Sequence, residues 1–442
     1  RIMYAEMITL KSGIIRLFRM FARTILNLPM FVFFDILNNV NTATALTLQS
    51  KRKIDKYPGY LLIFLLVPLT RLLGLVLRRN HRLTKPPGTI LFIKLMGLGS
   101  LLMAADSVLA VKNRFPDSRI ILLTDQQIAA GILPFGLFDE IRTISSRGWL
   151  AMITDALRVL ADTWRMKDLW VVDLEVYSKL TTVFSLMTIA INRFGFYLTP
   201  VFFRKYLNTH NVLFQRNGYL EDNYHAMAEA VTSARIDLQR EPVKPLTSLA
   251  GRRYIAVNNT CSALSFERKL SDRQLAAICL WIIEKMHYDI ALSGAPQDSD
   301  SNENFISQYL PFHRHRVLNL AGKSDFSGYY RFLREECACM VTIDSAPLHI
   351  AKAIGLPTVS VWGPTNPSVY HKVKAGEMQL HPFVYLAEHC SPCVHFHPKP
   401  PCGGNNFCIT GIEAVAIIDK LAGLIRHLHH SDRIETDAPV FV

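Results

Sequence analysis

One strand–helix–strand unit constrains the fold of this chain more than any other stretch. Val341–Ile343 is predicted to be the end of a buried strand, and Asp344 and Ser345 are residue types that cap helix N-termini. Apolar residues then recur at helical spacing, and a second apolar run, Thr358–Trp362, follows a glycine. A helix N-terminus presents unpaired N–H groups and a positive dipole end, so the first turn suits a diphosphate. An ordinary βαβ unit with a good cap is the alternative.

The same alternation of strands and helices occurs on both sides of a turn-rich linker at 239–251. The predicted strands are Thr89–Lys94, Arg119–Leu123, Leu169–Leu174, Tyr254–Asn258, Asp289–Ser293 and Val317–Asn319. Strands alternating with helices favour parallel, doubly wound sheets. We therefore expect an α/β chain with two Rossmann-like domains, residues 86–245 and 246–430, the second ending in a helix over Ile412–Leu428.

The positive charge of the chain is concentrated at its N-terminal end. The formal net charge is +13, and residues 1–85 hold 14 Lys or Arg against three acids. The remainder is therefore nearly neutral, which argues against nucleic-acid binding by the main body.

Residues 1–85 are also apolar, and we treat them as a separate extension. Ile14–Leu26 has the pattern of a basic amphipathic helix. Tyr60–Leu77 is a longer apolar run, but Pro68 and Arg71 interrupt it, which argues against an uninterrupted spanning helix. The extension is expected to associate with an anionic membrane surface. Helices packed on the protein's own body and a true span are the alternatives.

The segment DSAPLHIAKAIGLPTVSVWGPTNP resembles the signature of glycosyltransferase family 9, the ADP-heptose:lipopolysaccharide heptosyltransferases. The family pattern is Asp-Ser/Thr-Gly, a His-Ala pair, Gly-x-Pro and Gly-Pro-Thr-x-Pro, and Ala346 replaces its first glycine here. The resemblance covers roughly residues 88–425. It implies the GT-B arrangement, in which two Rossmann-like domains face each other across a cleft, and an ADP-sugar donor substrate.

The resemblance implies a donor-phosphate site at the start of the signature helix. Asp344, Ser345, Ala346 and His349 fall in this segment, and Ser345 and His349 can donate hydrogen bonds. A locally satisfied helix histidine is the alternative for His349. Arg268-Lys269 resembles the family's Lys-x-Trp-Pro position, and an arginine can supply a bidentate phosphate contact in place of the lysine. A solvated charged turn is the alternative there.

Two further turns resemble the nucleotide-binding loops of the family. Ser293-Gly294-Ala295-Pro296 follows a predicted strand, and Asp298 lies where an acid can bind ribose hydroxyls. LAGKSD, which contains Lys323, resembles the family's Leu-x-Gly-Lys-Thr/Ser loop near the nucleotide.

The resemblance is weakest where the catalytic base is expected. KLMGLGS resembles the family's first strand and turn, but Ser100 stands where the family has its presumed aspartate base. A serine hydroxyl has no useful basicity at neutral pH without a partner. We therefore expect Asp173 or Glu175, at the end of a predicted strand, to act as the base, with Arg268 assisting the leaving group. Asp106 is a weaker candidate.

Four of the eight cysteines lie close together near the C-terminus, at Cys390, Cys393, Cys402 and Cys408. A CxxC pair followed by two more cysteines favours a thiolate metal site within 390–408, holding iron or zinc, with two disulfides as the alternative. Catalysis itself needs no metal if helix dipoles and a cation bind the diphosphate.

These observations predict a transferase that moves heptose, or a related sugar, from an ADP-sugar to a lipopolysaccharide-core or other lipid-linked acceptor. It would be cytoplasmic and peripheral on the inner face of the cytoplasmic membrane. A catalytically silent relative that binds nucleotide sugar as a scaffold or sensor is the first alternative. A GT-B sugar-nucleotide epimerase is the second.

Overall fold

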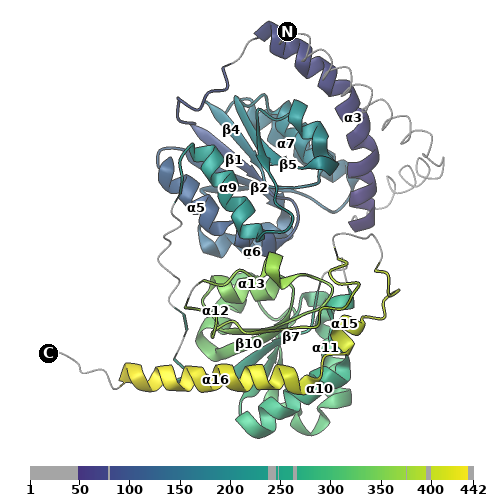
Figure 1. Cartoon of the computed structure of the whole chain (residues 1–442), viewed down its shortest axis with the longest axis vertical. Helices are drawn as coiled ribbons and strands as arrows, with labels where there is room; N and C mark the ends of the chain where they lie inside the picture. Colours follow the sequence, from purple (N-terminus) through teal and green to yellow (C-terminus); the bar gives the residue numbers. More distant parts are fainter. Residues whose placement is uncertain are drawn as a thin grey trace, which may run out of the picture. The chain divides into compact units, whose positions relative to one another are not determined.

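The computed structural model describes residues 48–77, 80–236, 245–246, 248–261, 266–374, 376–394 and 400–436. The amphipathic helix predicted over residues 14–26 lies outside the described residues. The chain divides into two compact units, each built around one parallel sheet (Figure 1).

The first unit contains a six-stranded parallel sheet in the order β3-β2-β1-β4-β5-β6. Its strands are β1 (Thr89–Ile93), β2 (Arg119–Asp125), β3 (Glu140–Ile144), β4 (Leu169–Asp173), β5 (Asn192–Tyr197) and β6 (His210–Leu213). The accompanying helices are α3 (Leu48–Leu77), α5 (Ala105–Arg114), α6 (Gln126–Ile132), η1 (Leu133–Phe135), α7 (Trp149–Thr163), α8 (Lys179–Met187), η2 (Thr199–Tyr206) and α9 (Leu220–Thr232). Strands β1, β2 and β4 start at the predicted residues.

Helices cover both faces of this first sheet. On one face, Val159 of α7 and Phe184 of α8 pack on alternate residues of the central strands, such as Leu91. On the other face, Phe115, which directly follows α5, makes an edge-on contact with Trp170 of β4. Both faces are buried, which explains why the central strands are continuous apolar runs.

Helix α3 belongs to the first unit and is not a separate extension. Ile63 and Val67 are buried in one cluster with Val183 of α8 and Phe203 of η2. Asp55 of α3 also accepts hydrogen bonds from the Ser178 hydroxyl and from two backbone N–H groups at the start of α8. Residues 48–77 therefore form a helix that packs on the protein's own body, which was one of the alternatives for this segment. None of the described helices has the length and apolar character needed to cross a membrane.

The second unit contains another six-stranded parallel sheet, in the order β12-β11-β10-β7-β8-β9. Its strands are β7 (Tyr254–Asn258), β8 (Asp289–Leu292), β9 (Val317–Asn319), β10 (Cys337–Ile343), β11 (Thr358–Trp362) and β12 (Phe383–Tyr385). Its helices include α4 (Leu98–Met103), η3 (Phe266–Arg268), α10 (Asp272–Trp281), α11 (Ser299–Tyr309), α12 (Phe326–Glu336), α13 (Ala346–Ala353), α14 (Pro367–Tyr370), α15 (Phe407–Thr410) and α16 (Ala414–Thr436). The predicted α/β fold class with two doubly wound domains is confirmed.

The boundaries of the two units differ from a simple split near residue 245. Residues 97–106 and 215–222 cluster with the second unit, although they lie far ahead of it in sequence. Helix α4 packs on α13 within this unit. The chain therefore passes between the units several times, which periodicity along the sequence cannot reveal because it reports local structure alone.

Candidate functional site

Four strands of the second sheet bring their carboxyl ends to one edge. Strands β10, β7, β8 and β9 are neighbours and all parallel, so the polar residues that follow them share that edge. They include Asp344 after β10, Asn258 at the end of β7, and Gly294 after β8. Most of the predicted donor-side residues therefore come from one edge of one sheet.

At the N-terminus of α13, the hydroxyl of the cap residue is hydrogen-bonded to a side chain from another strand and not to its own helix. Ser345 is the cap residue and has extended backbone dihedrals, but its hydroxyl makes no hydrogen bond to its own helix. Instead, Asn258 Nδ2 donates to Ser345 Oγ at 2.9 Å and to Thr342 Oγ1 at 3.1 Å. Because Ser345 Oγ accepts from Asn258, its own hydrogen can be donated to a ligand. Ala346 is the first residue of α13, so its backbone N–H has no partner within the helix. Pro347 carries no N–H, and the N–H of Leu348 donates to the backbone oxygen of Ser345 at 3.1 Å.

Arg268 lies against the turn between β10 and α13. Its Nη1 donates to the backbone oxygen of Asp344 at 2.8 Å and lies 3.8 Å from Asp344 Oδ2, with both side chains nearly buried. Burial raises the pKa of Asp344, and the Arg268 charge opposes that rise. The neighbouring Lys269 is half-buried, with its ammonium group over the ring of Phe266. The Arg268 guanidinium therefore lies beside the N-terminus of α13.

His349 is buried inside α13 and stays uncharged at neutral pH. Burial, reinforced by the charge of Lys352, lowers its pKa to about 3. Its Nε2 lies 3.9 Å from Asp344 Oδ1. A Cβ on Gly99 of α4 would approach the His349 ring to 2.6 Å, so this glycine permits the close packing of α4 on α13. His349 is therefore a neutral packed group and not a second cation for the donor.

The two predicted nucleotide loops are turns at the same sheet edge. Gly294 lies where a Cβ would meet Asp298 at 2.9 Å and Ala321 at 3.1 Å, so the turn after β8 packs tightly on the turn after β9. Asp298 Oδ2 accepts from the N–H of Ala295 at 2.9 Å, so one carboxylate oxygen already shapes the turn. Lys323 is exposed in the turn after β9.

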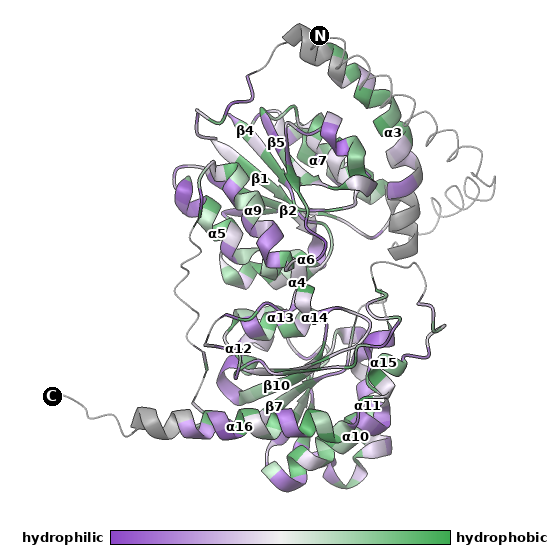
Figure 2. Cartoon of the chain, in the orientation of Figure 1, coloured by the Kyte–Doolittle hydropathy of each residue, from purple (hydrophilic) through white to green (hydrophobic). Residues whose placement is uncertain are grey.

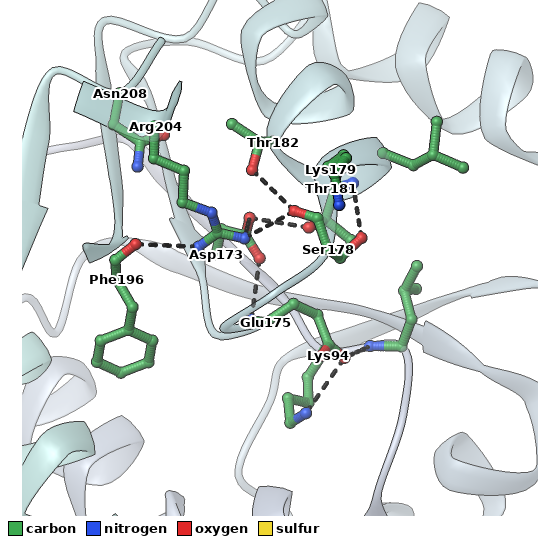
Figure 3. Close-up of polar contacts among 12 residues, drawn as sticks. Lys94, Asp173, Glu175, Ser178, Lys179, Thr181, Thr182, Phe196, Arg204 and Asn208 are labelled. Atoms are coloured by element: carbon green, nitrogen blue, oxygen red, sulfur yellow. Dashed lines mark hydrogen bonds and ion pairs between the residues drawn. The ribbon is translucent and has the colours of Figure 1, made fainter. Parts of the chain in front are cut away.

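Asp173, the first predicted base, is fully buried at the end of β4. Its Oδ2 pairs with Arg204 Nη2 at 3.0 Å and accepts from the Thr181 hydroxyl at 2.9 Å (Figure 3). Its Oδ1 accepts the N–H of Glu175 at 3.0 Å. Burial raises its pKa to about 6, with Arg204 acting in the opposite direction. Both oxygens are thus occupied, and the carboxylate serves as an internal structural group.

Glu175, the second predicted base, ties the turn after β1 to the end of β4. One oxygen, Oε1, accepts from the N–H groups of Leu95 and Met96, at 2.8 and 2.9 Å, and from Lys94 Nζ at 3.2 Å (Figure 3). The side chain is buried. Three donors on one oxygen hold this carboxylate in a fixed orientation. The structure assigns Glu175 to the shape of the turn.

Ser100 and Asp106 lie in the segment that joins the second unit. The Ser100 hydroxyl donates to the backbone oxygen of Gly97 at 2.8 Å, which gives it a local role at the start of α4. Asp106 is half-buried in the first turn of α5.

The four C-terminal cysteines influence one another electrostatically but do not form a ligand set. Burial raises the pKa of the Cys408 thiol, and the thiols of Cys393, Cys390 and Cys402 add to that rise. Within the described ranges, however, no three His, Cys, Asp or Glu side chains are arranged to hold a metal ion. All eight cysteines are free thiols, so the disulfide alternative is not formed either. The predicted iron or zinc site stays a prediction.

Sequence reasoning missed two residues that organise these sites. Asn258 was the last residue of a correctly predicted strand, and its polar side chain after an apolar run was a usable signal. Arg204, in contrast, lies 31 residues after Asp173 in a short 3-10 segment, η2. No local pattern links those two positions.

Solved structures share the two-sheet architecture. ADP-heptose lipopolysaccharide heptosyltransferase II of E. coli superposes with a TM-score of 0.59 at 15% identity, over 76% of this chain and 99% of that one. The family 9 glycosyltransferase of Veillonella parvula gives 0.61 at 16%, over 78% and 100%. At these identities the likeness establishes the fold, which is that of a two-domain GT-B glycosyltransferase.

Sequence comparison narrows this class to a family. Residues 204–399 match glycosyltransferase family 9 (heptosyltransferase), so this part of the chain is similar to that family, in agreement with the resemblance of the signature segment. Lipooligosaccharide heptosyltransferase 2 of Haemophilus influenzae is 37% identical over 81 residues, 18% of this chain and 23% of that protein. The Campylobacter jejuni protein of the same name is 22% identical over 225 residues, 51% of this chain and 67% of the relative. The first match thus spans about a quarter of the relative's length and the second two thirds.

Proposed function

We propose that this chain transfers a heptose, or a related sugar, from an ADP-sugar to a lipopolysaccharide-core or other lipid-linked glycan. The observation that carries the proposal is the open N-terminus of α13, with the Ser345 hydroxyl and the Arg268 guanidinium beside it. The family match spans this region and supports the same reaction class.

The chemistry follows from charge. Breaking the bond between an anomeric carbon and a diphosphate leaves negative charge on the departing phosphate oxygens. Under the proposal, the N–H of Ala346, the Ser345 hydroxyl and Arg268 bind that charge, and Lys269 approaches from the same turn. We do not assign Asp344 as the catalytic base, because its carboxylate is buried against Arg268.

The nucleotide would occupy the neighbouring turns of the same sheet edge. The close packing at Gly294 holds Asp298 in this turn, and the second carboxylate oxygen of Asp298 can accept from a ribose hydroxyl. Lys323 is exposed one strand further along and can contact the donor phosphate.

A binding protein without turnover is the second candidate, and a specific observation favours it. Ser100 replaces the family's presumed base, and Asp173 and Glu175 both have structural hydrogen bonds. If the chain is a working enzyme, Asp106 is the next carboxylate to test as the base, and Asp173 and Glu175 are positioning residues.

Association with the inner face of the cytoplasmic membrane completes the proposal. Residues 48–85 hold nine Lys or Arg and one acid. Several turns of α3 are coloured hydrophobic in Figure 2, and its exposed side chains include Leu61, Leu62, Leu65, Leu69 and Leu72. A lipid-linked acceptor would be presented at such a surface.

A transfer assay with a binding arm tests the function. ADP release and sugar incorporation are measured with ADP-heptose and a delipidated lipopolysaccharide-core fragment, and calorimetry measures ADP binding. Arg268→Ala should weaken ADP binding about tenfold or more, since it removes a charge-assisted hydrogen bond, while the exposed Arg314→Ala should not. Binding without transfer would establish the silent candidate. Unchanged binding in Arg268→Ala would remove the donor site.

A further inference from the structure

Helix α7 presents an apolar face to solvent. Its exposed positions are Leu150, Ile153, Thr154, Leu157, Arg158 and Ala161. Leu150 and Leu157 are 66% and 55% exposed, whereas Val159 is buried against the sheet. The helix therefore has apolar residues on both faces, and exposure of the outer face to water is unfavourable.

The apolar face continues onto the end of α8. Trp164, which follows α7 and is 58% exposed, donates from Nε1 to the backbone oxygen of Met187 at 2.9 Å. Met187 and Ile189 are exposed as well. The α7–α8 surface is defined here by Leu150, Ile153, Leu157, Trp164, Met187 and Ile189.

Ile189 has a backbone conformation that argues for a role beyond the fold. Its φ angle is +57°, in the left-handed region, and its side chain is 55% exposed. A β-branched residue is strained at such a φ, and glycine would relieve the strain. An exposed apolar side chain in a strained turn is typical of a position kept for binding and not for folding.

The charges around this surface are positive. Arg158 and Arg165 are exposed on or directly after α7. The two acids of α7 are partly buried and engaged, Asp155 with Arg158 and Asp162 with Arg142. Leucines with a tryptophan and arginines at the edge are the composition of helices that lie in a membrane interface.

We propose that the α7–α8 surface is a second membrane contact, which docks the first unit on an anionic phospholipid bilayer. It lies on the same face of the sheet as α8, on which α3 packs, so the leucines of α3 and this surface belong to one side of the unit. This inference rests on the proposed function, because a lipid-linked acceptor is held at a bilayer. The positive rim and the interfacial tryptophan favour lipid over a second protein chain.

Vesicle binding by the full-length protein tests the proposal. Vesicles of phosphatidylcholine with 30% phosphatidylglycerol (roughly the anionic content of a charged leaflet) are compared with pure phosphatidylcholine. Leu157→Ser should weaken binding to the anionic vesicles about tenfold, because half a leucine side chain loses its apolar contact. Leu133→Ser is the matched control, since Leu133 is 67% exposed in η1, outside the surface.

Two further readouts separate a lipid contact from a structural effect. Brominated lipids should quench a fluorescence component that Trp164→Phe abolishes. Ile189→Gly should leave the melting temperature unchanged or higher and yet weaken vesicle binding, a combination that a structural role cannot produce. Wild-type vesicle binding in both Leu157→Ser and Ile189→Gly overturns the proposal. So does a change in oligomeric state at unchanged vesicle binding, which would make the surface a protein interface.

An assay of sugar transfer to the delipidated acceptor fragment distinguishes failure of this inference from failure of the proposed function. The surface variants should transfer sugar to that soluble fragment at the wild-type rate. Absence of transfer in the wild-type protein refutes the function, while vesicle binding still reports on the surface.

Discussion

At the scale of single residues, Gly99 shows how a missing side chain permits one helix to approach another. The Cβ position of Gly99 lies 2.6 Å from the buried His349 ring, closer than real contacts allow. The ring has little room to move, because His349 is buried within α13. The glycine therefore fixes how closely α4 packs on the helix that carries the candidate phosphate site.

Gly99→Ala should destabilise the protein by about 1–3 kcal/mol, because overpacking against a buried ring costs more than the gain in helix propensity. It should also weaken ADP binding through displacement of α13. Gly423→Ala is the control: Gly423 lies in α16 with open space around it, so alanine should stabilise the protein by up to about 1 kcal/mol. Urea unfolding and calorimetry with ADP measure both effects. Equal stabilisation by the two substitutions would contradict the packing argument.

Glu221 gives the second unit a pH-dependent stability. Burial raises the pKa of its carboxyl group to about 7, although the charge of Lys352 acts the other way. Among the described residues, Glu221 Oε2 has no hydrogen-bond partner. The folded state therefore holds its proton up to a higher pH than the unfolded state, so stability falls as pH rises from roughly 4.5 to 7.

Glu221→Gln should remove this dependence. We expect the substitution to stabilise the protein by up to about 3 kcal/mol at pH 8, relative to wild type, and to change little at pH 4.5, where the folded state is protonated and the unfolded state about half protonated. Urea unfolding at the two pH values measures the difference, with the exposed Glu335→Gln as the control. An equal effect of Glu221→Gln at both pH values would count against a raised pKa.

At the scale of elements, most of the strands that the sequence did not predict lie at sheet edges. Strands β7, β9 and β11 have the predicted ends, and β7 and β11 are apolar runs. Strands β3, β5, β6 and β12 were not predicted. Three of them, β3, β6 and β12, lie at sheet edges and carry exposed or half-buried residues, whereas β5 is buried but is interrupted by Arg193 and Gly195. An edge strand pairs on one side alone, so its composition is less restricted.

The residues proposed for the donor and those proposed as the base differ in how far local sequence pattern could place them. Asp344 and Ser345 follow a recognisable strand and begin a recognisable helix, so local pattern placed them correctly at a sheet edge. Asp173 also ends a buried strand, but its role depends on Arg204, which arrives from another element. Sequence pattern can place a carboxylate at a strand end, but its partner across space decides whether it can act as a base.

Asp173→Asn should destabilise the protein by about 3–5 kcal/mol, since it leaves the Arg204 charge buried without a partner. Turnover per folded molecule should change much less than the ~10²–10⁴-fold expected for loss of a general base. Thermal unfolding, and transfer rates corrected for the folded fraction, separate the two roles. Asp117→Asn, at an exposed turn after α5, controls for loss of an acid. Wild-type stability with a hundredfold lower rate would restore Asp173 as the base.

At the scale of the whole molecule, the first unit begins earlier in the chain than residue 86, the boundary that composition predicts, because it includes α3. Removal of residues 1–47 should leave the melting temperature of the first unit nearly unchanged, because α3 and its contacts remain. Removal of residues 1–80 should lower it sharply: burial of Ile63 and Val67 contributes about 1.5–3 kcal/mol each, and the cap from Asp55 is lost. Calorimetric melting of the two truncated proteins measures this. Equal melting temperatures would mean that α3 is a separate extension after all.

The membership of α4 in the second unit has a consequence for biosynthesis. Helix α4 leaves the ribosome about 250 residues before its packing partner His349 exists, a delay of roughly 12–50 s at ~5–20 residues per second. During that interval, α4, with its apolar Leu98, Leu101 and Leu102, lacks the helix α13 on which it packs. The second unit therefore cannot be completed before residue 349 has emerged, and a nascent chain stalled before that point should be a preferred client of chaperones that bind apolar segments.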